Sequence, residues 1–185
     1  MLWTISLCSS IAGYGILSWM PTVASRLYDL PIEQALQFGL IINGSAFAGN
    51  FLAFLLIDSI GRKATFSLGF IGGGVALLVL GLLGQTWSAD EVMLAAAAAM
   101  LFLAMPLSSL YVYAPELYPT NIRALGAGSA STWLRIGSIV GPMAVGYILP
   151  AFGVQAVFIF FSAACVVGIS AILIAGTETS GQLLE

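Results

Sequence analysis

Long apolar stretches separated by short polar connections make up most of the chain. Each stretch has close to the ~20 residues that a helix rising about 1.5 Å per residue needs to cross roughly 30 Å of hydrocarbon. Backbone donors and acceptors must be paired within the segment there, which favours helices. The pattern predicts an all-α polytopic membrane protein: one six-transmembrane-helix domain (1–175) and a short tail (176–185). We place the spans at about 2–23, 36–57, 64–84, 92–113, 125–149 and 154–175.

Composition excludes a water-soluble protein. Hydrophobic residues make up 60% of the 185 residues and charged residues only 7%, with a mean hydropathy of +1.05. A globular domain carries roughly 25% charged residues. The lipid bilayer is therefore the expected partner, and the net charge of −3 argues against nucleic acid. Cys8 and Cys165 both lie in apolar stretches, where a thiol packs as a small hydrophobe.

The sequence offers little catalytic chemistry. It contains no histidine, and no aspartate or glutamate lies deep within a predicted span. A metal-ligand cluster and an acid near a serine or cysteine, the usual signs of an active site, are both missing from the spans. We therefore expect no metal site, no cofactor and no enzymatic activity.

Basic residues in the connections predict the orientation, since loops rich in Lys and Arg tend to stay in the cytoplasm. Arg62 and Lys63 lie between the second and third spans and Arg123 between the fourth and fifth, whereas Arg26 lies on the opposite side. We therefore expect these two connections and the tail in the cytoplasm, with the domain in the plasma (inner) membrane. We expect Met1 on the outer side.

The start of the chain suggests a missing part. Met1 is followed at once by Leu2 and Trp3, without the positive region expected of a signal peptide or a first inserted helix. We expect a preceding amino-terminal six-helix half to be missing. A complete six-span protein is the alternative.

Small residues and prolines recur within the spans. Gly69 and Gly73 are four apart, as are Gly137 and Gly141, a spacing that lets helix backbones approach closely in a bilayer. Pro106 and Pro142 lie inside spans, where each removes a backbone hydrogen bond and can kink the helix.

The two cytoplasmic connections carry the sharpest motifs. The first reads Asp58-Ser59-Ile60-Gly61-Arg62-Lys63, in which Gly61 permits a tight reversal and the acid and base can bond to helix ends. The second reads P-E-L-Y-P-T-N-I-R, with Glu116 and Arg123 seven residues apart. Alone, the first motif could be just a charged turn that anchors the membrane orientation.

Together, in this order and separated by two spans, the motifs resemble those of the major facilitator superfamily, specifically its carboxy-terminal half with the seventh to twelfth helices. The resemblance covers nearly the whole chain. Further similarity to porters of niacin and aromatic acids, among the metabolite:proton symporters, lies in Tyr14 to Thr22, Arg135-Ile136-Gly137 and Gly141-Pro142. The tail Glu178-Thr179-Ser180-Gly181 is similar to the ending of sugar-porter-like members. Phe54 and Leu134 depart from the family pattern, which usually has glycine at both positions.

The resemblance implies a secondary transporter that moves a small organic acid or related metabolite by alternating access, with proton coupling. It also implies a cytoplasmic gate whose acids and bases join helices in one state and separate in the other. The gate residues would be Asp58, Arg62, Glu116 and Arg123, with Gly61 supplying the turn beside Lys63. Exposed pairs of this kind are worth about 0 to 1 kcal/mol each, which suits a switch between two states of similar free energy.

Arg135 is the most informative single residue. It lies roughly ten residues, or about 15 Å, into the fifth span, near the bilayer midplane. An arginine there costs about 2.5 to 3.5 kcal/mol to insert, so it should face a watery cavity or a partner. A guanidinium can bind a substrate carboxylate in bidentate fashion. A purely structural role is the alternative.

Other polar residues are candidates for the substrate site. Asn43 and Asn50 share one face of the second span, where amides bind either substrate or a neighbouring helix. Tyr14 and Tyr111 would line the cavity by the resemblance. Trp19 could stack on an aromatic substrate or anchor the helix at the membrane interface.

Three hypotheses remain from the sequence. The first is a transporter half for a small organic anion, with a sugar substrate as its main variant. The second is a truncated, non-transporting membrane subunit. The third, a membrane-embedded enzyme, is disfavoured by the absence of catalytic clusters. If transport is proton-driven, the proton carrier must lie in the missing half, because the spans hold no acid or histidine.

Overall fold

A computed structural model describes residues 1–27 and 30–179 of the chain. In this part of the chain all regular structure is helical. The helices are α1 (Leu2–Leu27), α2 (Ile32–Ser59), α3 (Arg62–Leu83), the short 3-10 helix η1 (Gly84–Thr86), α4 (Ala89–Glu116) and α5 (Arg123–Ala175). Ser180 and Gly181 of the tail motif lie outside the described residues.

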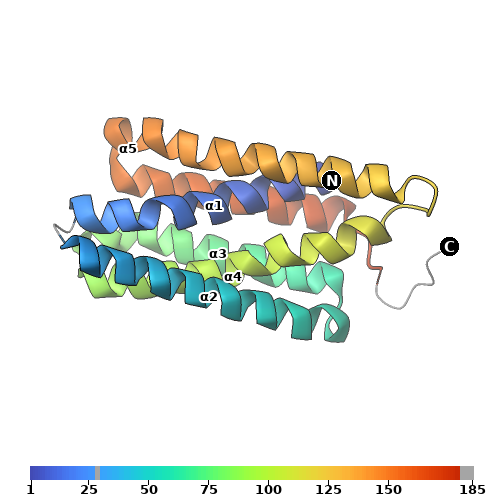
Figure 1. Ribbon diagram of the computed structural model, residues 1–185, viewed down its shortest axis with the longest axis horizontal. Helices are drawn as coiled ribbons and strands as arrows, with labels where there is room; N and C mark the ends of the chain where they lie inside the picture. Colours follow the sequence, from blue (N-terminus) through green and yellow to red (C-terminus); the bar gives the residue numbers. More distant parts are fainter. Residues whose placement is uncertain (28–29, 180–185) are drawn as a thin grey trace.

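α5 doubles back on itself at Gly153. The backbone there has φ 78° and ψ 178°, a conformation that glycine adopts without a steric penalty. The limb 123–152 and the limb 154–175 run antiparallel, so the described residues form six helical rods packed side by side (Figure 1). The predicted boundary between the fifth and sixth spans falls at this reversal.

Four of the described helices are long and apolar enough to cross a membrane: α2, α3 extended through η1, α4 and α5. With 53 residues, α5 is long enough for two passes of ~20 residues each. α1 is not among the four. The hydroxyls of Ser6, Ser9 and Ser10 are buried and donate to carbonyls of the preceding turn at 2.7 to 2.9 Å, which satisfies them without water.

Small residues allow close helix contacts. A Cβ added at Gly141 of α5 would lie 2.5 Å from the Ile11 carbonyl oxygen of α1, and one at Gly69 of α3 would lie 2.9 Å from the Phe102 carbonyl oxygen of α4. Glycines at such contacts let backbones approach where lipid supplies no hydrophobic drive. α1 therefore packs directly against the first limb of α5, and α3 against α4.

α4 begins with a reciprocal cap. The Ser88 backbone N–H donates to the Glu91 carboxylate at 2.7 Å, and the Glu91 backbone N–H donates to the Ser88 hydroxyl. Two otherwise unpaired N–H groups are thereby satisfied at the end of the bundle that holds the connection between α3 and α4.

The expected position of Met1 is wrong. Figure 1 shows the chain's amino terminus at the same end of the bundle as the 117–122 connection and the end of α5. Trp3 donates from Nε1 to Ser129 Oγ at 2.9 Å and stacks on Trp133 with ring centroids 5.8 Å apart, which places it beside the start of α5. The physical reason is parity: six spans return the chain to the side from which it started. If the basic connections are cytoplasmic, Met1 is cytoplasmic too.

Candidate functional site

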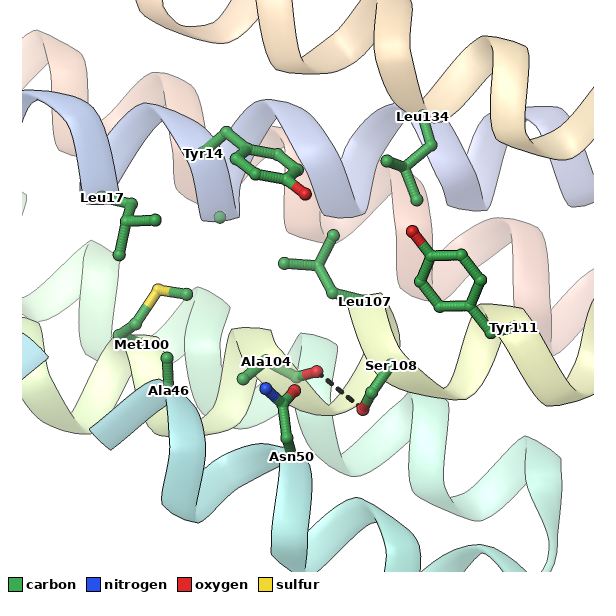
Figure 2. A pocket seen from close by; sticks show the side chains of 11 residues that line it. Tyr14, Leu17, Ala46, Asn50, Met100, Ala104, Leu107, Ser108, Tyr111 and Leu134 are labelled. Carbon is green, nitrogen blue, oxygen red and sulfur yellow. Dashed lines mark hydrogen bonds between the residues drawn. The ribbon is translucent and has the colours of Figure 1, made fainter. Parts of the chain in front are cut away.

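A cavity of about 300 Å³ lies between α1, α2, α4 and the first limb of α5 (Figure 2). We call it the central cavity. Its lining residues are Gly13, Tyr14, Leu17, Ala46, Asn50, Met100, Ala104, Leu107, Ser108, Tyr111 and Leu134. A volume of this size is at the lower end of the range for small-molecule sites, which are mostly apolar with a few placed polar groups.

The polar groups of the central cavity are neutral. They are the hydroxyls of Tyr14, Ser108 and Tyr111 and the amide of Asn50, which approach the cavity from three helices (Figure 2). Ser108 Oγ donates to the Ala104 carbonyl at 3.0 Å, so its lone pairs remain free to accept from a ligand. Two aromatic rings and these groups suit a small aromatic or polyhydroxylated molecule.

The structure brings three of the sequence-predicted residues, Tyr14, Asn50 and Tyr111, to this cavity. Asn43 lies two turns before Asn50 on α2, but it does not line the cavity and donates to the Gly39 carbonyl at 2.7 Å. Trp19 donates from Nε1 to the Pro142 carbonyl at 3.0 Å and so links α1 to α5 rather than lining the cavity.

Arg135 lies beside the central cavity, not in its lining. The preceding residue, Leu134, lines the cavity, and a one-residue step along a helix turns the side chain by about 100°. Arg135 is exposed, and within the described part of the chain its guanidinium makes no ion pair. An intramembrane charge left on the outside of the bundle needs a partner that the described residues do not supply.

A cluster of charged residues closes one end of the bundle around Arg62. Its guanidinium binds the Glu116 carboxylate with two bonds, Nε to Oε2 at 3.0 Å and Nη2 to Oε1 at 2.8 Å. Nη1 donates to Asp58 Oδ1 at 2.8 Å and to the Ile57 carbonyl at 3.2 Å. The Arg62 and Glu116 side chains are 10% and 15% exposed, whereas that of Asp58 is 74% exposed. Bidentate geometry and partial burial make the Arg62–Glu116 pair the stronger one.

The tail after α5 completes this cluster, which sequence reasoning missed. The Glu178 carboxylate accepts from the backbone N–H groups of Arg62 at 2.9 Å and Lys63 at 3.0 Å, at the positive end of the α3 dipole. Thr179 Oγ1 donates to Glu116 Oε2. The Tyr113 hydroxyl donates to the Thr177 carbonyl at 2.8 Å and accepts from its N–H. The Glu-Thr pair in the tail motif was the available signal, while nothing in the sequence marked Tyr113.

Of the remaining predicted gate residues, Gly61 and Lys63 lie beside the cluster and Arg123 does not contact it. Gly61 has φ 91°, which a side chain rarely adopts, and a Cβ there would lie 2.7 Å from Glu178 Oε2. Lys63 Nζ donates to the Leu173 carbonyl at 3.2 Å. Arg123 donates from Nε to the Tyr118 carbonyl at 3.4 Å, within its own connection, and not to the Arg62 cluster. No three His, Cys, Asp or Glu residues of the described ranges are grouped to hold a metal ion.

Comparison with known proteins identifies relatives over the whole chain. The family model described as "Sugar (and other) transporter" matches residues 3–185. The niacin transporter NiaP of Acinetobacter baylyi is 33% identical over the full chain, and the putative niacin/nicotinamide transporter NiaP of Bacillus subtilis is 32% identical. The putative metabolite transport protein YdjK of Escherichia coli is 29% identical over 98% of the chain. The chain spans 42%, 46% and 39% of the lengths of these three relatives.

The match and the relatives' names indicate a transporter and not an enzyme, and an integral membrane protein. They agree with the all-α bundle and with the motifs at residues 58–63 and 115–123. The chain belongs to the sugar (and other) transporter family of the major facilitator superfamily.

Proposed function

We propose that this chain forms the carboxy-terminal half of a secondary transporter that carries a small organic acid or related metabolite across the plasma membrane by alternating access. The observation that carries the proposal is the central cavity, in which three helices place neutral hydrogen-bonding groups and two aromatic rings around about 300 Å³. The Arg62 cluster supports it, because it ties α3, α4 and the tail together at one end of that cavity's bundle.

The substrate class follows from the cavity and the relatives together. Two relatives are named as niacin transporters, and niacin is a small aromatic acid whose ring could pack between Tyr14 and Tyr111. Its carboxylate would need a cation, and the central cavity itself is lined by neutral groups. We propose that Arg135 supplies this charge from the edge of the cavity, where its exposed side chain would meet the second half of the transporter.

The second half would cover the exposed face of this one. Large apolar side chains stand out from α2, with Leu40, Phe47 and Phe54 each more than 70% exposed. Lipid or another helical unit must cover such a face. The relatives are more than twice as long as this chain, which leaves room for an amino-terminal six-helix half. That half would also hold the proton carrier, because the predicted spans of this chain contain no acid or histidine.

A carbohydrate is the second candidate substrate. The lining of hydroxyl and amide groups without a charge favours a neutral, hydrogen-bonding solute, and the matching family model is described by sugar transport. Nicotinamide, which the name of the Bacillus subtilis relative includes, is a third solute of this neutral kind.

Uptake measurements test the proposal. Cells that express the longest reading frame containing this chain would be given radiolabelled nicotinate, benzoate, nicotinamide or glucose, with and without a protonophore. We expect nicotinate or benzoate uptake that the protonophore abolishes and that Arg135→Ala reduces by roughly tenfold or more, the cost of one charged hydrogen bond. Undiminished uptake in Arg135→Ala would remove the arginine from the site. Uptake of glucose alone would replace the acid by a sugar.

A further inference from the structure

A second, smaller cavity adjoins the central cavity between α2 and α4. It has a volume of about 140 Å³, and we call it the side chamber. Asn50 and Ser108 line both spaces, so the side chamber is a continuation of the central cavity. Its other lining residues are Ala53, Phe54, Ile57, Ser109 and Val112.

The Ser109 hydroxyl in the side chamber lacks a hydrogen-bond partner. The residue is 2% exposed, and within the described residues its Oγ is buried and makes no hydrogen bond. Ser6, Ser9 and Ser108, in contrast, donate to carbonyls of the preceding turn. A buried hydroxyl without a partner destabilises a fold, so its presence calls for an explanation. Because Ser109 lines the side chamber, an occupant of this space can supply the missing partner.

The lining of the side chamber sets the chemistry of that occupant. A space of about 140 Å³ admits a few waters or a part of a ring-sized solute. The Ser109 hydroxyl can donate one hydrogen bond and accept others, and the Asn50 amide has two donors and one acceptor. The rest of the lining is mostly apolar. This set suits one polar atom or substituent of a solute whose other part lies in the central cavity.

We propose that the side chamber recognises a hydrogen-bonding atom on the ring of the solute, and that the Ser109 hydroxyl is the group that determines this specificity. The inference rests on the proposed function, because it narrows the solute class of the same site. Nicotinate has a ring nitrogen that is unprotonated near neutral pH and accepts a hydrogen bond, whereas benzoate has a C–H group at that place. A solute without the acceptor leaves Ser109 unpaired, so the site discriminates against it.

The two parts of such a solute would meet different helices. Figure 2 shows Leu134 on one side of the central cavity and Asn50 and Ser108 on the other. Arg135, the residue after Leu134, is the proposed partner of the carboxylate. A ring whose carboxylate points toward α5 therefore presents its other edge to α2 and α4, which form the side chamber.

Paired uptake measurements test the role of Ser109. Cells that express the longest reading frame containing the chain are given radiolabelled nicotinate or benzoate at a series of concentrations, and KM is obtained for each solute. For the native protein we expect a KM for nicotinate about tenfold below that for benzoate. Ser109→Ala should raise the KM for nicotinate until the ratio of the two values is close to one, because the hydroxyl that distinguishes the two rings is gone.

Ser9→Ala is the matched control. It removes a hydroxyl that is similarly buried but already donates to the Ile5 carbonyl at 2.7 Å, and Ser9 lines neither of the two spaces. This variant should keep the native ratio of the two KM values, even where less folded protein reaches the membrane. If glucose alone is taken up, its monodeoxy analogues replace benzoate, and Ser109→Ala should abolish the preference for one of the hydroxyl groups.

An unchanged ratio of KM values in Ser109→Ala would overturn the inference and leave the proposed function standing, because the side chamber would then hold buried water only. Equal KM values for nicotinate and benzoate in the native protein would overturn it as well. Uptake of none of these solutes would instead remove the proposed function, and the inference with it.

Discussion

Arg62 joins three segments of the chain at one end of the bundle: its own helix, the end of α4 through Glu116, and the end of α2 through Asp58. The two acids differ in burial, at 15% and 74% exposed. The Coulomb attraction of an exposed pair is screened by water, whereas a partly buried carboxylate depends on its partner. The two acids should therefore contribute unequally to the free energy of unfolding.

Glu116→Gln is expected to lower the free energy of unfolding by about 2 to 3 kcal/mol, because the bidentate charged pair is lost where water cannot replace it. The matched change Asp58→Asn should cost at most about 1 kcal/mol. Thermal unfolding in detergent, followed by a thiol-reactive dye that detects exposure of the buried Cys8 and Cys165, measures both. Equal losses from the two variants would contradict the ranking.

Gly61→Ala should destabilise the same end of the bundle by about 1 to 2 kcal/mol, because a side chain at φ 91° is strained and its Cβ would meet Glu178. Gly44→Ala is the control: a Cβ there meets nothing within 4 Å, and alanine favours a helix interior over glycine. The control should unfold at the same or a higher temperature. A Gly61→Ala protein as stable as the control would mean that the turn tolerates a side chain.

Short linear motifs made part of the site predictable at this scale. One connection holds Asp58, Gly61 and Arg62, and another holds Glu116. The resemblance of both motifs to the family indicated that they lie at the same face of the membrane. Contacts made by the tail were not predictable, because Glu178 reaches the α3 amino terminus across more than a hundred residues of sequence. Arg135 shows a different limit. Hydropathy gives the depth of a residue in the membrane, but the direction of its side chain depends on how the whole helix is rotated about its axis.

At the scale of the helices, hydropathy predicted an all-α fold because lipid forces each apolar stretch into a helix. The break at Gly153 fell between the two predicted spans, where the non-helical backbone of this residue separates the two limbs of α5. α1 was predicted from its length and apolar content, and it is on average the least hydrophobic of α1 to α5, with buried serines at Ser6, Ser9 and Ser10. Their hydroxyls bond to its own carbonyls, which a hydropathy scale does not register.

Gly141→Ala should loosen α1 from α5, because its Cβ would lie 2.5 Å from the Ile11 carbonyl and 3.1 Å from the Ile11 Cα. Backbone cannot rotate away as a side chain can, so we expect a loss of about 1 to 3 kcal/mol. Gly146→Ala, on the same limb, meets only Trp19 at 3.9 Å and should be nearly neutral. The unfolding temperatures of the two variants test this expectation. Equal temperatures would show that α1 and α5 can move apart without a loss of stability.

At the scale of the molecule, the topology determines at which end of the bundle Met1 lies, which the charges in the sequence alone did not determine. The parity of the rods places Met1 at the end that holds the basic connections, so the orientation of one connection fixes all of them. The central cavity opens among the same helices that carry the most exposed faces, α2 and the first limb of α5. A second helical unit packed against those faces would complete the cavity.

The assignment of the central cavity as the solute site is tested most directly by comparing two asparagines of α2. Asn50 lines the central cavity, whereas Asn43, two turns earlier, does not line it and bonds to the Gly39 carbonyl. Radiolabelled nicotinate uptake would be measured in cells expressing the longest reading frame that contains the chain, with matched surface levels of each variant. Loss of one hydrogen bond to the solute predicts a KM raised roughly fivefold to tenfold for Asn50→Ala and within about twofold of the native value for Asn43→Ala. An unchanged KM for Asn50→Ala, or an equal rise for both variants, would contradict the assignment of this cavity as the place where the solute binds.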